Sequence, residues 1–286
     1  VAKHKIYYAI SSSSAVMGGG ASLPPQPRTL VFQGRLNPQE ESEVEQQRVA
    51  AILESLPGAL VVRASPSAPP GHLVASLFDQ LVVLEDLGDC GRPFNLTPLP
   101  LAKVNSELGD WLTLPYGRPF TVALPGLHMA TESALRKNDI SLGGQEVFLA
   151  AASFQAMGSQ TLLLGRWRTG GHSLNTLLKE FFQEWPEKSA SESLQRAMLL
   201  VMTEPLDAGQ EPRVQVKPND PPAKTAHPLF WANLLLIDAG HGSTAAEGPP
   251  AGNNPPAAAQ ENQPAEAPGG QAPQQQANPP AADKDQ

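Results

Sequence analysis

Two short apolar runs, at Phe120 to Leu124 and at Gln160 to Leu164, organise the middle of the chain. Pro and Gly bound both runs, which is typical of strands covered on both faces. Between them lie a loop over 125–144 and an apolar stretch, Gln145 to Met157, of helical length. A strand, a helix and a second strand in this order predict a parallel crossover unit, and therefore an α/β fold.

The same pattern of apolar and polar positions repeats on either side of this unit. It predicts strands at Thr29 to Gln33, Leu60 to Val62 and Leu81 to Leu84, a short opening strand at Lys5 to Ser11, and a closing strand within LFWANLLLID, residues 229–238. It predicts helices at Glu40 to Leu56, His72 to Phe78, around Leu101 to Leu108, Ser173 to Trp185 and Ser189 to Val201. The alternation favours a doubly wound, mostly parallel sheet with helices on both faces.

The composition changes sharply after Asp238. From residue 239 to 286 the chain contains no Leu, Ile, Val, Met, Phe, Tyr or Trp, and consists largely of Ala, Pro, Gly, Gln and Asn. Such a segment cannot bury enough apolar surface to offset the entropy lost on ordering. We therefore expect one folded domain over residues 1–238 and a disordered tail over 239–286.

Charge and cysteine content narrow the functional classes. The net charge is −8, and the basic residues form no stripe, so we expect no nucleic-acid partner. The single cysteine, Cys90, cannot form an intrachain disulfide, and no apolar run has the roughly 18 residues that a membrane span needs. With Val1 as the first residue and no leader pattern, we expect a cytoplasmic domain taken from a longer polypeptide.

The loop after Leu124 is the first place to look for chemistry, because ligands of such sheets gather at the carboxyl ends of the strands. It reads Pro125, Gly126, Leu127, His128, and none of these is a nucleophile. No metal-ligand spacing, P-loop or dinucleotide fingerprint is present, so we expect no metal and no cofactor.

Several strings stand out along the chain: KIYYAISSSSAV, RTLVFQGRLNP and, as the most specific, FQAMGSQTLLLGRW, LLKEFFQEWPEKSASESLQRAML and HPLFWANLLLID. In order and at matching spacing from about Lys5 to Asp238, they resemble the CHAT domain, a caspase-like family of the clan that includes caspases and separase. The resemblance implies a caspase-like three-layer sandwich. It also implies tetratricopeptide or other helical repeats on the N-terminal side in the full-length protein.

Active members of the family carry a histidine just after the third strand and a cysteine just after the fourth. Here the third strand runs LVVLEDLG, which puts Asp86 in the place of the histidine, or Leu87 if the glycine is taken as anchor. The fourth runs VALPGLH, which puts Leu127 in the place of the cysteine. An acidic pair often follows the tryptophan of strand five, but Trp167 is followed by Arg168, Thr169, Gly170 and Gly171. We therefore expect an inactive domain that binds a protein or peptide partner as an interaction or regulatory module.

Two alternatives remain open. The first is an active cysteine endopeptidase, in which Cys90 and His128 form a dyad with exchanged positions across the same crevice. The second is a doubly wound domain that binds a small ligand.

We expect the remaining histidines, including His227, to be structural, and Trp167 and Trp231 to be core aromatics.

Overall fold

The computed structural model describes residues 8, 24, 26–38, 40–88, 95–102, 106–114, 119–128, 145–168, 170–185, 187–211, 214 and 224–238. The chain divides into two units, Val1–Thr244 and Ala245–Gln286, and the described residues all belong to the first. The predicted boundary between residues 238 and 239, and the predicted disorder beyond it, concern residues outside the described part.

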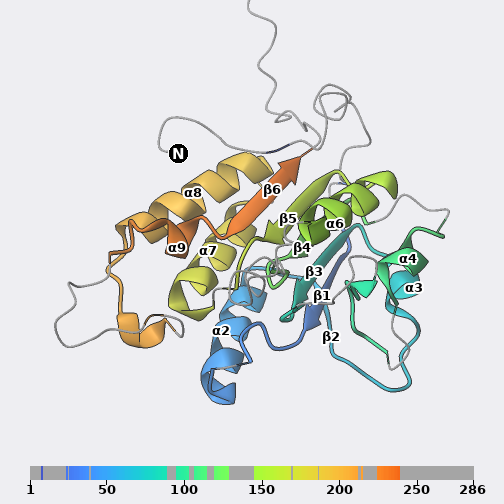
Figure 1. Cartoon of the computed structure of the whole chain (residues 1–286), viewed down its shortest axis with the longest axis horizontal. Helices are drawn as coiled ribbons and strands as arrows, with labels where there is room; N and C mark the ends of the chain where they lie inside the picture. The colour runs from blue at the N-terminus through green and yellow to red at the C-terminus, as the bar shows by residue number, and fades with distance from the viewer. Residues whose placement is uncertain are drawn as a thin grey trace, which may run out of the picture. The chain divides into compact units, whose positions relative to one another are not determined.

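A mixed sheet forms the centre of the first unit (Figure 1). Its strands are β1 (Thr29–Gln33), β2 (Leu60–Val62), β3 (Gln80–Leu84), β4 (Thr121–Leu124), β5 (Thr161–Gly165) and β6 (Leu234–Asp238). They lie in the order β2-β1-β3-β4-β5-β6, with every pair parallel except the last. The predicted α/β class and mostly parallel sheet are confirmed.

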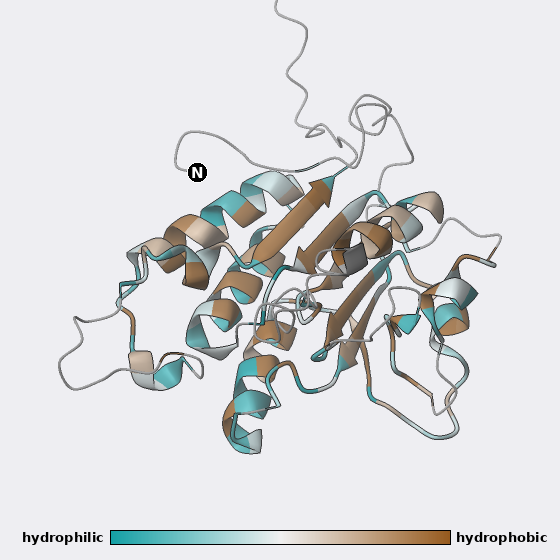
Figure 2. Cartoon of the chain, in the orientation of Figure 1, coloured by the Kyte–Doolittle hydropathy of each residue, from teal (hydrophilic) through white to brown (hydrophobic). Residues whose placement is uncertain are grey.

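Helices cover both faces of this sheet (Figure 1). On one face α2 (Ser42–Glu54), α7 (Gly171–Glu184), α8 (Ala190–Thr203) and α9 (Pro228–Trp231) pack against the strands, and on the other lie α3 (Gly71–Ala75), α4 (Leu108–Trp111) and α6 (Gln145–Ala156). The strands are the most hydrophobic part of the unit (Figure 2). In β5, Leu163 packs with the first group of helices, while Leu162 and Leu164 pack with the second, as alternation along a strand requires.

The start of α8 is fixed by two polar side chains. Ser189 and Glu192 form a capping box, in which the Glu192 N–H donates to the Ser189 hydroxyl over 3.3 Å. This arrangement satisfies two donors at the helix start that would otherwise have no partner. His227 likewise has a structural role, since its Nδ1 accepts the Leu229 N–H at the start of α9 over 3.2 Å.

Two predicted helices differ from the structure. The helix predicted at His72 to Phe78 ends at Ala75, and Leu73 and Leu77 of the predicted range are 47% and 61% exposed. That helix has five residues, and it approaches the core closely through Gly71, whose added Cβ would lie 2.4 Å from the Leu99 carbonyl oxygen. The helix expected around Leu101 to Leu108 begins at Leu108, where Asp110 accepts the Glu107 N–H over 3.0 Å.

The N-terminal segment reaches the open side of β6 at one described residue. Tyr8 pairs in parallel with Ile237: its N–H donates to the Leu236 carbonyl over 2.9 Å, and its carbonyl accepts from Asp238 over 3.2 Å. The other residues of the strand predicted at Lys5 to Ser11 lie outside the described part of the chain.

Candidate functional site

The carboxyl ends of β3, β4 and β5 bring three polar side chains together. Asp86, His128 and Arg168 each stand a few residues beyond the end of one of these neighbouring strands. His128 Nε2 lies 2.8 Å from Asp86 Oδ1, and an Arg168 guanidinium nitrogen lies 2.7 Å from Asp86 Oδ2. The same guanidinium nitrogen lies 3.1 Å from His128 Nε2. The parallel sheet therefore assembles a three-residue ionic cluster from positions 42 and 40 residues apart along the chain.

The cluster is largely closed to solvent. The side chains of His128 and Asp86 are 8% and 9% exposed, while that of Arg168 is 29% exposed. Burial by itself would raise the pKa of Asp86, but the His128 hydrogen bond and the positive charge of Arg168 outweigh it, so the pKa of this carboxyl is lowered. Asp86 is therefore an ionised carboxylate at neutral pH, with both oxygens paired.

The turn after β4 is fixed by its backbone. The Leu127 N–H donates to the Leu124 carbonyl over 3.1 Å, and the Leu87 N–H donates to the Gly126 carbonyl over 3.1 Å. A Cβ added to Gly126 would lie 1.9 Å from the Glu85 carbonyl oxygen, so only glycine allows the turn to approach so closely. One potential donor to a ligand oxygen, the Leu127 N–H, is thus already engaged, and Pro125 has no N–H to give.

Leu127 belongs to the core. Its side chain is 1% exposed and packs in the hydrophobic cluster that includes β3, β4 and α6. Its backbone pairs with Leu87 in an isolated parallel bridge, which places the two loops side by side. The two positions that the resemblance aligns with a catalytic dyad are therefore neighbours in space, but the partner of the Asp86 side chain is His128.

Sequence reasoning identified two members of this cluster and missed the role of the third. Asp86 and His128 were candidate positions, whereas Arg168 stood out only because it replaces the acidic residue that often follows the strand-five tryptophan. The sequence did contain a signal for Arg168: each of the three residues follows a buried parallel strand, and such strand ends converge at one edge of the sheet.

The two tryptophans that were expected in the core, Trp167 and Trp231, are both half-buried.

The other candidate residue at this edge is Cys90. It lies outside the described residues, and the nearest described residue on its N-terminal side is Gly88. Gly88 does lie near the cluster, since a Cβ added there would stand 3.6 Å from His128 Nε2. Among the described residues, no group of three His, Cys, Asp or Glu side chains has a metal-binding arrangement, and no helix is long and apolar enough to span a membrane.

Comparison with known proteins supports the family resemblance. Residues 113–239 match the model of the CHAT domain family, a region that runs from the loop before β4 to the end of β6. No curated protein and no solved structure gives a match. The matched region contributes His128 and Arg168 to the cluster, and β3, which precedes Asp86, pairs directly with β4 inside that region. On this match, residues 113–239 are similar to the CHAT domain, a caspase-like family.

Proposed function

We propose that this CHAT domain is catalytically inactive and works as a protein-interaction or regulatory module of a larger protein. One observation carries the proposal: at the carboxyl edge Asp86 is paired with His128 and Arg168, and Leu127, where the resemblance would put the nucleophile, is an apolar residue buried in the core.

Peptidase chemistry of the caspase kind requires a thiolate, an imidazole to take its proton, and N–H donors for the oxyanion. Leucine has no lone pair with which to attack a carbonyl carbon. The Leu127 N–H bonds to Leu124, so it is not directed at a bound ligand. Arg168 and His128 both contact the Asp86 carboxylate, so the contacts of this carboxylate are made within the cluster.

The test of inactivity uses a peptidyl probe with a thiol-reactive group, applied to the full chain and to two variants, Cys90→Ser and His128→Ala. We expect no labelling that depends on His128, and no cleavage of a fluorogenic peptide library. Labelling of Cys90 that is lost in His128→Ala would contradict the proposal.

One observation favours a second candidate, the cysteine peptidase with Cys90 as nucleophile and His128 as base. His128 already has a carboxylate partner in Asp86 at 2.8 Å, the arrangement that orients the imidazole in catalytic triads. The probe experiment distinguishes the two candidates directly, because this one predicts rapid labelling at Cys90 that both variants abolish.

The binding part of the proposal is tested by placing a photo-crosslinking amino acid on the carboxyl edge. Arg63 directly follows β2 at this edge and is exposed; Leu77 is exposed near the opposite end of β3 and serves as the matched control. We expect a defined protein adduct from position 63 and none from position 77. Equal adducts from both positions, or none from either, would count against a partner at this edge.

A further inference from the structure

A cavity of about 220 Å³ lies beside the last strand, where α8 runs along β6 and α9 leads into it (Figure 1). Its wall is largely apolar, and the aliphatic and aromatic side chains of the wall come from all three elements: Leu194, Met198, Trp231, Leu234 and Leu236. Tyr8 also lines the cavity and is 46% exposed, so a molecule can reach the cavity from solvent. None of the described lining residues belongs to the ionic cluster at the ends of β3, β4 and β5.

Arg166 is the only charged side chain among the described residues that line this cavity. It directly follows β5, and its backbone N–H donates to the carbonyl of Asn233, the residue before β6, over 2.8 Å. Its guanidinium donates to the Tyr8 hydroxyl over 3.3 Å and lies over the Tyr8 ring, 5.3 Å from the ring centroid. Its Nε is buried and has no hydrogen-bond partner among the described residues. Arg166 therefore brings one positive charge to an apolar wall.

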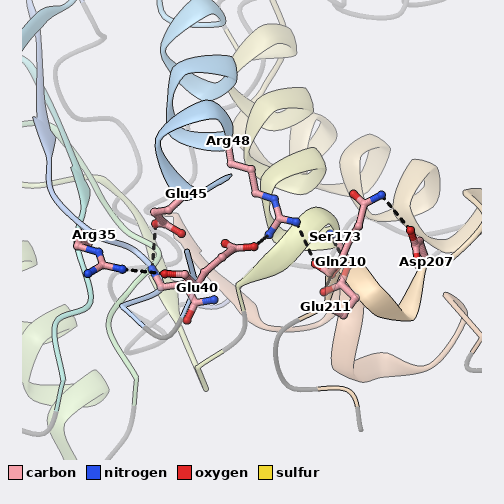
Figure 3. Close-up of polar contacts among 9 residues, drawn as sticks. Arg35, Glu40, Glu45, Arg48, Ser173, Asp207, Gln210 and Glu211 are labelled. Carbon is pink, nitrogen blue, oxygen red and sulfur yellow. Dashed lines mark hydrogen bonds and ion pairs between the residues drawn. The ribbon is translucent and has the colours of Figure 1, made fainter. Parts of the chain in front are cut away.

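The other half-buried arginines that the structure describes each pair with a carboxylate. Arg48 pairs with Glu40 (Figure 3), and Arg168 pairs with Asp86 at 2.7 Å. Arg166 has no carboxylate partner among the described residues, and its contact with tyrosine supplies only a neutral oxygen and the face of a ring. A half-buried guanidinium is stabilised more by a carboxylate than by such neutral groups, because the carboxylate balances its charge. The cavity thus contains a positive charge that no described group neutralises.

We propose that this cavity binds a small aliphatic carboxylate, whose carbon chain lies on the apolar wall of Leu194, Met198 and Trp231 and whose carboxylate pairs with the Arg166 guanidinium. The site is separate from the ionic cluster of the carboxyl edge. The proposal does not depend on whether the domain is inactive or binds a protein partner.

The charge and the size of the cavity indicate this class of ligand. A planar guanidinium matches the geometry of a carboxylate, and their hydrogen bond is stronger in a poorly hydrated cavity than in water. The single guanidinium balances one negative charge, which favours a monocarboxylate over a phosphate. The volume of about 220 Å³ is below the roughly 300–1,000 Å³ of sites for drug-sized molecules, so the cavity fits a short chain such as that of hexanoate.

Met198 provides a reporter inside the cavity for an NMR titration of the intact chain, labelled with ¹³C at the methyl groups of its five methionines. Hexanoate is added to about 20 mM, since a ligand of this size binds in the millimolar range. We expect a saturable shift of the Met198 signal, which is assigned by its loss in Met198→Leu. The signal of Met157, in the core cluster on the other face of the sheet, should not move. Hexanamide has the same size without the charge and should bind about tenfold more weakly, and butanoate should bind about two- to fourfold more weakly for each methylene removed.

Arg166→Gln separates the charge from the apolar wall. This variant should bind hexanoate about tenfold more weakly and hexanamide with unchanged affinity. Arg196→Gln is the matched control: Arg196 is an exposed residue of α8 that pairs with Glu184 and does not line the cavity, so both affinities should stay as in the natural chain. The Met157 signal shows whether each variant is folded, and the comparison of hexanoate with hexanamide in the natural chain needs no variant.

Three results would overturn the proposal. The first is the absence of a saturable Met198 shift with hexanoate, or equal affinities for hexanoate and hexanamide in the natural chain. The second is an unchanged affinity for hexanoate in folded Arg166→Gln. The third comes from an acetylated tripeptide that ends in leucine with a free carboxylate: tighter binding of this peptide than of hexanoate would assign the cavity to a peptide carboxyl terminus instead of a free acid.

Discussion

Replacing Arg168 with alanine should expose how strongly the ionic cluster holds the three strand ends together. Asp86 is 9% exposed, and its two oxygens are bound by His128 at 2.8 Å and Arg168 at 2.7 Å. Removing one partner of a fully buried ion pair costs about 3–5 kcal/mol. Because Arg168 is 29% exposed and Asp86 keeps its bond to His128, we expect Arg168→Ala to lower the free energy of unfolding by about 1–2 kcal/mol.

A double-mutant cycle with Asp86→Asn separates this interaction from the loss of packing by the arginine side chain. Urea unfolding at pH 7 gives the free energy of unfolding for the natural chain, the two single variants and the double variant. We expect a coupling energy of about 1 kcal/mol between the two positions. Additivity of the two single changes within about 0.5 kcal/mol would show that the Asp86–Arg168 pair does not stabilise the fold, and the reasoning about the cluster would fail.

Four further predictions follow from the burial, charge and composition already described. The carboxylate of Asp86 has a lowered pKa, so its stabilisation is present at neutral pH and lost below roughly pH 4; an acid titration of stability should be shallower in Asp86→Asn. Gly126→Ala should destabilise strongly in a thermal melt, while Gly88→Ala, with its Cβ 3.6 Å from the nearest atom, should not. Leu163→Ala in β5 should cost about 2–5 kcal/mol in denaturant; a neutral result would mean the strand is poorly packed. Deleting residues 239–286 should change the melting temperature by less than about one degree, and a larger drop would mean that the tail docks on the domain.

The sheet could be predicted from sequence because its strands are short apolar runs with clear boundaries. Thr29 to Gln33 and Leu60 to Val62 were predicted with the observed ends, since polar or turn-forming residues flank both. The short helices were predicted less well. Leu73 and Leu77 are apolar and four residues apart, but the helix ends at Ala75, before Leu77, and its buried residues are Gly71 and Ala75.

Only part of the candidate site could be predicted from the sequence. Resemblance to a family gives positions just after a strand, such as Asp86 and Leu127, but does not say where their side chains point. Leu127 points into the apolar core and His128, the next residue, reaches Asp86. The pairing with Arg168 depends on the spatial order of β3, β4 and β5, which a linear pattern does not contain.

The pairing of Tyr8 with the last strand has a mechanical consequence. Tyr8 and Asp238 are joined by a hydrogen bond of 3.2 Å, so polypeptide attached at these two points would enter and leave the fold side by side. Because the two segments run parallel, a pull at both ends would load this bond and its neighbour at Leu236 in shear, while the rest of the sheet carried little of the tension. In a domain connected in this way, tension between the two attachment points would pass through the Tyr8 pairing and bypass most of the fold. Such tension would separate Tyr8 from β6 before it unfolded the core.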